Sequence, residues 1–465
     1  MRDALPAAAV RFVLVFLLLL TWALGIGRYG GPDEPAHVIR SFAAAHGDLT
    51  GDPADPLPPG YRTVSVPEGL ASGDPACYRH DSATTSACAT ASPGDGRVRV
   101  ATSAGLTPPL YHLAVGGLVR LVGDPADTAW YRVAAAVLHA VVVALAMQRA
   151  RRSMLVATIA ALTPAAWFLL GVVNPSSLEI ALALLAWVGV SRFVESGSPT
   201  TTDAWWIAAP LALAVAVRPV AAVTACAALV VIELRRGARG RRLVLVAPIA
   251  AAAVAVLAWG LAVGTQIDDP RTAVHRSFLD SLTDSLGSLG EIAYDAVGSL
   301  GWNEFLAPRP ASVAWVLIWI ATAATFAWRA RGDARLARWR APIAWLAVLV
   351  ASPVVFETVM AGSVGPIWQG RYSIPVLIGV VAIAPWPAPS ARAAIVVVAV
   401  AGLAEVATYW ASVRRYAVGT EGSWWLDGAF RSSAWLAPGT WVVVHVATVA
   451  VAVALVARCA QGQVK

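Results

Sequence analysis

The chain has 465 residues, of which 58% are hydrophobic and 14% charged, and its formal net charge is +7. Soluble domains are about half apolar and about a quarter charged, so the composition excludes a soluble globular protein and indicates a polytopic membrane protein. The positive charge does not indicate nucleic-acid binding, because the arginines cluster in short loops between apolar runs, as the positive-inside rule requires.

Apolar runs that approach the roughly 20 residues needed to cross a bilayer recur along the whole chain. The predicted spans are residues 10–27, 129–148, 154–173, 176–194, 204–217, 219–234, 243–264, 311–329, 341–361, 371–386, 393–411 and 437–457. The arginine-rich loops at 149–152, 235–242 and 329–340 fall on one side if both termini are cytoplasmic. We therefore predict a single all-α domain over residues 1–465 in the cytoplasmic (inner) membrane, with about 12 spans in a range of 11–13.

Two segments leave alternatives open. The first run, 10–27, resembles a signal peptide, but its length and the polar motif that follows at once favour a retained helix. The short segment 108–122 carries His112 and Arg120, and we predict a re-entrant or interfacial helix there. If it crosses the membrane, the arginines of 149–152 lie outside, against the charge rule; thirteen spans with a weak second helix is the alternative.

Three polar segments lie outside the membrane in this topology. They are the large loops 28–107 and 265–310 and the shorter segment 412–436. Cys77 and Cys88 both lie in the first loop, where an extracytoplasmic location favours a disulfide between them. Two free thiols are the alternative.

The motif Gly-Pro-Asp-Glu-Pro-Ala-His at 31–37 directly follows the first span. Asp33 suits an N-cap and Pro35 a first helical turn, which predicts a helix over 34–46 along the membrane surface. Asp33, Glu34 and His37 share one face of such a helix. One interpretation is that Asp33 caps the helix and Glu34 favours its dipole. The other is that both carboxylates serve chemistry near a lipid head group.

Ionisable residues in the predicted spans favour the second interpretation. Glu179, Arg218, Glu357, Arg371 and Glu405 all map to the extracytoplasmic half of the membrane. Such residues are costly inside a bilayer and are usually functional. The sequence therefore predicts a polar cavity that opens to the outside at the depth of the lipid head groups.

Several motifs in order carry a resemblance to a known family. They are Pro-Asp-Glu-Pro-Ala-His (32–37), Pro-Pro-Leu-Tyr (108–111), Asn-Pro (174–175), Arg-Pro (218–219), Gly-Trp with a following Pro (301–308) and Gln-Gly-Arg-Tyr-Ser-Ile-Pro (369–375). With them the chain resembles a bacterial family of predicted membrane proteins of unknown function. The layout is in turn similar to the GT-C glycosyltransferases, which use polyprenyl-phosphate sugars.

The GT-C resemblance implies an acidic catalytic residue in the first outer loop, followed by surface-parallel helices. Asp33 corresponds to that position, with Glu34 beside it. The bacterial family often has an Asp after Asn-Pro, where this chain has Ser176. Glu179, one turn further, is a candidate substitute, and the departure puts metal binding and full activity in doubt.

The chemistry of such a transfer suggests roles for these residues. A carboxylate is needed as general base for the acceptor hydroxyl, and Asp33 is the first candidate, supported by Glu34. Arginine binds phosphate in a bidentate manner, which suggests Arg371 first and Arg218 second. We also expect His37, Tyr372, Glu357 and Glu179 to contact substrate. A divalent metal at Asp33, Glu34 and His37 is an open alternative, because the spacing makes no recognisable site.

The resulting hypothesis is an inverting glycosyltransferase on the extracytoplasmic face of the membrane. It moves a sugar from a polyprenyl-phosphate donor to a hydroxyl of an envelope glycan or glycolipid, and it has no nucleic-acid partner. One alternative is a flippase for a lipid-linked sugar, which should have polar residues through both leaflets. Another is a non-catalytic envelope-assembly protein, for which Ser176 is the main argument.

Overall fold

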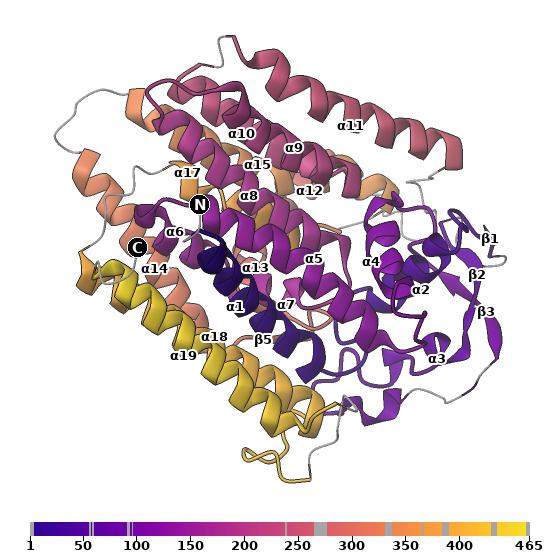
Figure 1. Ribbon diagram of the computed structural model, residues 1–465. Coiled ribbons are helices and arrows are strands. Elements are labelled where there is room, and N and C mark those ends of the chain that lie inside the picture. Colours follow the sequence, from indigo (N-terminus) through magenta and orange to yellow (C-terminus); the bar gives the residue numbers. More distant parts are fainter. Residues whose placement is uncertain are drawn as a thin grey trace.

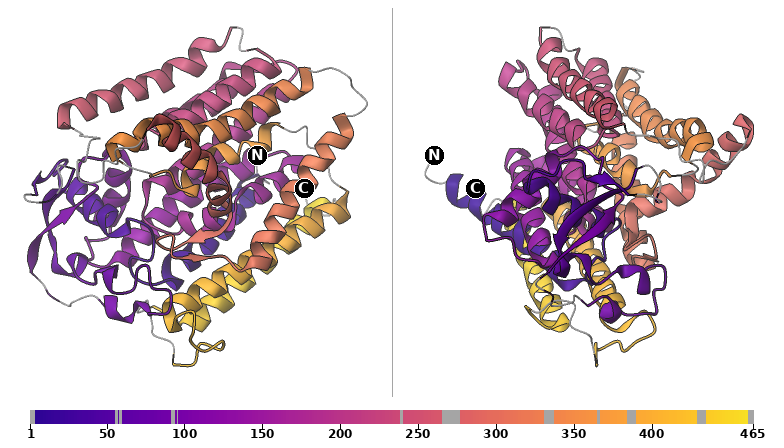
Figure 2. Two further views of the ribbon diagram at one scale, coloured as in Figure 1. Left: turned by 180° about the vertical axis from the view of Figure 1, so that it is seen from behind. Right: turned by 90° about the vertical axis from the view of Figure 1, so that its right-hand side faces the viewer.

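The computed structural model describes residues 4–54, 57, 60–90, 94, 96–237, 240–264, 277–330, 337–364, 367–383, 390–428 and 435–461. Long helices form a bundle, and most of the segment between α1 and α5 folds as a layer at one end of it (Figure 1). The N- and C-termini lie close to each other, away from that layer, in the views of Figures 1 and 2.

Seven described helices are long and apolar enough to cross a membrane. They are α1 (Ala4–Gly25), α5 (Thr128–Arg149), α8 (Pro175–Glu195), α11 (Arg242–Val263), α15 (Ala337–Val364), α18 (Ala391–Val418) and α19 (Pro438–Ala460). Three further predicted spans are the helices α9 (Thr201–Val217), α10 (Ala221–Arg235) and α14 (Arg309–Ala330). The structure therefore supports a polytopic membrane protein but does not confirm the count of about 12.

Two predicted spans are broken into shorter helices. The run 154–173 forms α6 (Arg152–Ala161) and α7 (Pro164–Leu170), and the run 371–386 forms α16 (Gly370–Leu377) and α17 (Val380–Ile383). At the first break Thr163 is extended and its hydroxyl oxygen accepts the N–H of Ala166, with Pro164 as first helical residue. The mean hydropathy of a run does not reveal such a break, because both halves of the run are apolar.

Helix α8 forms the centre of the bundle. Its apolar window is 89% buried, and it packs against α5, α7, α9, α10, α16 and α17. Helix α11 is more apolar but only 6% buried, and it lies at the edge of the bundle against α9 (Figure 1). Of these two helices, which are apolar all round, α8 is therefore buried by protein and α11 is left for contact with lipid.

The first outer loop contains a small β-sheet, so the all-α prediction is wrong for this segment. Strands β1 (Asp52–Pro53), β2 (Arg62–Pro67) and β3 (Arg97–Thr102) pair antiparallel in the order β1-β2-β3. Val64 and Val66 of β2 are buried while Ser65 between them is exposed. This period-two alternation is the sequence signal for a strand.

Helix α2 (Glu34–Ala45) covers this sheet, and α4 (Leu110–Arg120) packs against α2. The two helices approach so closely that a Cβ on Gly116 would lie 2.0 Å from the carbonyl oxygen of Ser41. Helix α4 has 11 residues, about half of what a membrane crossing needs. This length agrees with the prediction that segment 108–122 does not cross.

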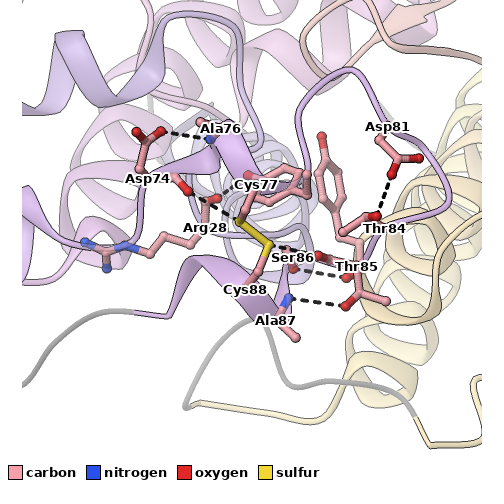
Figure 3. The surroundings of a disulfide bond; sticks show 12 residues. Arg28, Asp74, Ala76, Cys77, Asp81, Thr84, Thr85, Ser86, Ala87 and Cys88 are labelled. Atoms are coloured by element: carbon pink, nitrogen blue, oxygen red, sulfur yellow. Dashed lines mark hydrogen bonds between the residues drawn. A yellow bond between two sulfur atoms is a disulfide. The ribbon is translucent and has the colours of Figure 1, made fainter.

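A disulfide joins Cys77 and Cys88 in the same outer loop (Figure 3). Each cysteine belongs to a short 3₁₀ helix, η1 (Pro75–Cys77) or η2 (Ser86–Ala89). The short helix α3 (Glu68–Ala71) precedes them. The fully buried Arg415, near the end of α18, donates hydrogen bonds to three carbonyl oxygens of the disulfide-closed loop, at Tyr78, Asp81 and Thr84. The loop is thus fastened to the helix bundle.

The second predicted outer loop, 265–310, is described from residue 277; residues 265–276 lie outside the described part. It forms α12 (Phe278–Gly287), α13 (Leu289–Gly298) and a hairpin of β4 (Ser299–Leu300) and β5 (Phe305–Leu306). Helix α13 packs against α7 and α16, one piece of each of the two broken spans.

One buried ion pair fixes the turn between α1 and α2. Arg132 of α5 binds both carboxylate oxygens of Glu34, with Nε–Oε1 at 2.7 Å and Nη2–Oε2 at 2.6 Å. The same guanidinium donates to the carbonyl oxygens of Ala23 (3.1 Å) and Gly27 (2.8 Å) at the end of α1. A charged pair so deeply buried is stable only when its hydrogen bonds are satisfied, as they are here.

We predict that Arg132→Leu lowers the free energy of unfolding by about 3–5 kcal/mol, because it leaves the Glu34 carboxylate buried without its partner. Thermal unfolding of the full-length protein in detergent measures the change, and the double variant Glu34→Leu with Arg132→Leu should recover much of it. The control is Arg99→Leu, which removes an exposed pair with Asp52 and should change stability by about 0–1 kcal/mol. Equal melting temperatures for the two single variants would contradict the prediction.

Candidate functional site

Asp33 has a backbone conformation that is rare for residues other than glycine. Its φ is 57° and its ψ 10°, in the left-handed region, directly before α2. The side chain makes no capping hydrogen bond, so the interpretation of Asp33 as a helix-capping side chain is wrong. Its Oδ2 instead accepts a hydrogen bond from Nη2 of Arg371 at 2.9 Å. Strain of this kind collects at functional sites and is maintained by surrounding contacts.

Arg371 begins a chain of polar contacts that continues through Tyr372 to a second arginine. Arg371 Nη2 donates to the Tyr372 hydroxyl at 3.2 Å, and its Cζ lies 5.1 Å from the centroid of that ring. Arg218 Cζ lies 4.3 Å from the same centroid. Arg218 Nη1 also donates to Oε2 of Glu179 at 3.1 Å. We call Asp33, Arg371, Tyr372, Arg218 and Glu179 the arginine–carboxylate cluster.

Four separate elements supply this cluster. Asp33 lies in the α1–α2 turn, Glu179 in the first turns of α8, Arg218 directly after α9, and Arg371 with Tyr372 at the start of α16. Arg218 is extended because Pro219 follows it, which ends α9 at this point. The side-chain exposure is 49% at Asp33, 9% at Arg371, 22% at Arg218 and 2% at Glu179. The cluster is therefore open at Asp33 and closed at Glu179.

Glu34 lies outside this cluster although it is adjacent to Asp33 in the sequence. It is fully buried, and its two oxygens accept the Arg132 guanidinium and the backbone N–H groups of Val173 (3.1 Å) and Gly31 (3.1 Å). All of the hydrogen bonds that Glu34 accepts hold the turn between α1 and α2 in place. The geometry therefore assigns Glu34 a structural role, in place of the catalytic role expected from the sequence.

His37 is buried on α2 and stacks on His112 of α4, with ring centroids 5.5 Å apart. Burial lowers the pKa of His37 to about 4; the Asp33 carboxylate opposes this, and Arg218 and Arg371 add to it. The imidazole is therefore uncharged at neutral pH. Its buried Nδ1 has no hydrogen-bond partner in the described part of the chain. His37 thus borders the cluster as a neutral group.

The Asn-Pro motif connects the Asp33 turn to α8. The Asn174 side chain donates from Nδ2 to the carbonyl oxygen of Pro32 at 2.8 Å and accepts at Oδ1 from the N–H of Ser176 at 2.9 Å. Ser176 is buried in the first turn of α8. Glu179, one turn later and the candidate substitute for the acid expected at position 176, joins the cluster from this helix.

Glu357 is not among the residues of the cluster. Its Oε1 accepts the backbone N–H groups of Ile367 (2.8 Å) and Trp368, which lie between α15 and α16. It therefore holds the segment that leads to Arg371. Glu405, also expected near the outer ends of the spans, is buried in α18 and accepts from Trp22 Nε1 at 2.8 Å.

No group of three or more His, Cys, Asp or Glu side chains that could hold a metal ion occurs within the described ranges. Asp33, Glu34 and His37 do not form such a group, because Arg371 binds Asp33 and Arg132 encloses Glu34. The cluster instead presents two guanidinium groups on one tyrosine ring. This arrangement suits an anion with several oxygens, such as a phosphate.

Arg132, which fixes the position of Asp33, was not among the site residues expected from the sequence. The signal was present, because an arginine inside the apolar run 129–148 is a charge at membrane depth. Its partner Glu34 lies 98 residues earlier, so the pairing itself was not visible in the sequence.

Residues 16–380 match the model of a family described as "Predicted membrane protein (DUF2142)". No curated protein matches the chain. Two crystal structures of ArnT from Cupriavidus metallidurans are similar to it at 14% identity over 98% of this chain. The structure bound to undecaprenyl phosphate has a TM-score of 0.46 with 78% of its chain covered. The apo structure has a TM-score of 0.47 with 77% covered. Likeness at this level carries no weight for function.

Gly370 allows α16 to reach the position from which Arg371 meets Asp33. A Cβ at this residue would lie 2.4 Å from the Ala296 nitrogen and 2.5 Å from the Asp295 Cβ, both in α13. The obstructing atoms include backbone, which does not move aside as the end of a flexible side chain does. A glycine is therefore required where the N-terminus of α16 touches α13.

We predict that Gly370→Ala lowers the free energy of unfolding by about 1–3 kcal/mol through overpacking. Thermal unfolding of the full-length protein measures the effect. Gly290→Ala is the matched control, because a Cβ at that position in α13 meets nothing within 4 Å. It should be neutral or stabilising by up to about 1 kcal/mol. A Gly370→Ala protein as stable as the Gly290→Ala protein would show that the contact is not tight.

Proposed function

The chain belongs to the DUF2142 family of predicted membrane proteins, and we propose that it is a membrane glycosyltransferase of the GT-C type. It transfers a sugar from a polyprenyl-phosphate donor to a hydroxyl of an envelope glycan or glycolipid on the extracytoplasmic face. The observation that carries this proposal is the contact of Asp33 with Arg371, beside Arg218, in one half-open cluster.

Arg371 and Arg218 supply the phosphate-binding half of this mechanism. Each guanidinium offers several N–H donors in a plane, and such groups bind phosphate oxygens in a bidentate manner. Both lie within about 5 Å of the Tyr372 ring centroid, so one phosphate beside that ring can contact both. Their positive charge stabilises the leaving phosphate as negative charge develops on it.

Asp33 supplies the general base. Half of its side chain is exposed, and Arg371 occupies only Oδ2 in the contacts of the described chain. The carboxylate takes the proton of the acceptor hydroxyl as the acceptor oxygen forms a bond to the anomeric carbon. The bond from that carbon to the phosphate oxygen breaks, and its electron pair leaves with the polyprenyl phosphate. A single displacement of this kind inverts the anomeric centre.

Three observations favour an enzyme over an assembly protein that has lost its activity. Such a protein is under no constraint to keep Asp33 near Arg371, yet the two side chains are hydrogen-bonded at 2.9 Å. Glu179 completes the cluster from α8 although Ser176 replaces the expected acid. The strained backbone of Asp33 adds to this, because strain persists where function requires it.

We predict that Asp33→Asn reduces sugar transfer at least about 100-fold while leaving the fold intact, because the amide cannot accept the hydroxyl proton. Mass spectrometry of envelope glycans from cells that carry only the variant measures transfer, and thermal unfolding checks the fold. Asp52→Asn, the same change at an exposed residue of the same outer loop, should transfer normally. Unchanged glycans in the Asp33→Asn cells would overturn the proposed base.

We predict that Arg371→Lys weakens the binding of undecaprenyl phosphate by at least about 10-fold, because lysine keeps the charge but loses the planar fork of donors. Native mass spectrometry of the full-length protein measures the lipid affinity. Arg392→Lys is the matched control at an exposed residue at the start of α18 and should bind as the unaltered protein does. Equal affinity in the two variants would remove Arg371 from the phosphate site.

A further inference from the structure

A cavity of about 600 Å³ lies beside the arginine–carboxylate cluster. Its walls come from α12, α13, the β4–β5 hairpin and the α15–α16 link. Trp368 and Gln369 of that link line it, and the next turn of chain carries Arg371 and Tyr372. The rings of Trp368 and Tyr372 are in edge contact, with centroids 5.8 Å apart. The cavity and the cluster therefore share a wall.

The lining of this cavity is strongly acidic. Five carboxylates line it: Asp284, Glu291, Asp295, Glu304 and Glu357. No Lys, Arg or His within the described part of the chain lines it. Arg415 neutralises one of the carboxylates through an ion pair with Glu304 at 3.0 Å. Glu291 and Asp295 have neither a hydrogen bond nor an ion pair from their side chains to any described residue. Asp284 also has an interaction partner of its own, so the uncompensated negative charge of the cavity lies at Glu291 and Asp295.

Glu357 extends the acidity of this cavity below the surface, whereas Asp284 and Glu291 are exposed. Glu357 is only 6% exposed, and its Oε1 is taken by the backbone N–H groups of Ile367 and Trp368. Its Oε2 has no hydrogen-bond or ion-pair partner among the residues that the structure describes, although the residue lines the cavity. A carboxylate oxygen that faces a cavity and receives no donor from the protein is available to accept a hydrogen bond from a ligand.

The arrangement of these carboxylates favours an organic cation over a metal ion. They do not gather in a group of three that could hold a metal within the described ranges, so they are spread around the walls. Three aromatic residues, Tyr294, Phe305 and Trp368, share the lining. Spread carboxylates with aromatic faces between them suit an ammonium group on a larger polar molecule. A volume of this size accommodates a small ligand such as a sugar.

We propose that this cavity binds the acceptor of the transfer reaction, and that this acceptor carries a protonated primary amine together with its hydroxyl groups. The inference rests on the proposed function, because the cavity adjoins the cluster that contains the base. The amine pairs with Glu291 and Asp295, and a hydroxyl donor satisfies Glu357. Burial and the neighbouring Glu291 carboxylate raise the pKa of Asp295 to about 6.

The recognition of an amine by the cavity is tested directly with three probes: glucosamine, N-acetylglucosamine and glucose. Saturation-transfer NMR on the full-length protein in nanodiscs gives their affinities. We expect glucosamine to bind at least about 10-fold more tightly than either neutral sugar, since an ionic hydrogen bond contributes about 1.5–3 kcal/mol. The double variant Glu291→Gln with Asp295→Asn should lose this preference. Glu421→Gln with Asp427→Asn is the control, because it removes the same charges from exposed residues outside the cavity.

Three outcomes would overturn the inference: no binding of glucosamine, equal binding of glucosamine and N-acetylglucosamine, or a preference that survives in the Glu291→Gln, Asp295→Asn protein. Calcium binding that this double variant abolishes, without selective glucosamine binding, would make the cavity a metal site instead. The Asp33→Asn variant separates this inference from the proposed function. It should keep selective glucosamine binding while transfer is lost. If the Asp33→Asn protein still transfers sugar, Asp33 is not the general base. The Glu291→Gln, Asp295→Asn protein still tests the cavity in that case.

Discussion

The buried pair of Arg132 and Glu34 is the contact on which the position of the site depends. One guanidinium on α5 binds a carboxylate at the start of α2 and three carbonyl oxygens at the end of α1, so three segments meet at one charge. Glu34 also accepts from Val173 N, which brings the α7–α8 link to the same point. Charges in an apolar interior are stable only with complete hydrogen bonding, and this requirement makes the turn rigid. Asp33, the residue between α1 and α2, is thereby held in its left-handed conformation.

The two adjacent acids, Asp33 and Glu34, therefore have different roles. Glu34 is closed off by four hydrogen bonds and stabilises the turn, whereas Asp33 is half exposed and reaches Arg371. The same separation holds for the glutamates of the spans. Glu179 joins the arginine–carboxylate cluster, while Glu357 holds the α15–α16 link and lines the acidic cavity. In each case the local partners decide the role, and the residue type alone does not.

Broken helices make room for polar groups inside an apolar bundle. Irregular backbone at membrane depth is tolerated only where protein or a cavity covers it. The breaks at α6–α7 and α16–α17 satisfy this condition, because both segments pack on the buried helix α8 or its neighbours. Gly370 then lets α16 approach α13 closely enough for Arg371 to reach Asp33 and for Trp368 to close the acidic cavity. Cluster and cavity are thus products of one tight contact.

The sequence by itself determined the membrane class, the location of most long helices and the first-loop motif, because hydropathy and charge are local properties. It also singled out Asp33, Arg218, Arg371 and Glu179, since charges near spans stand out from an apolar background. It did not show the β-sheet, the helix breaks or Arg132. Only the tertiary structure decided which acid meets which arginine: Asp33 and Arg371 are 338 positions apart, and Glu34 and Arg132 are 98 apart. The reason is that hydropathy separates apolar from polar segments but does not encode which buried faces pack together.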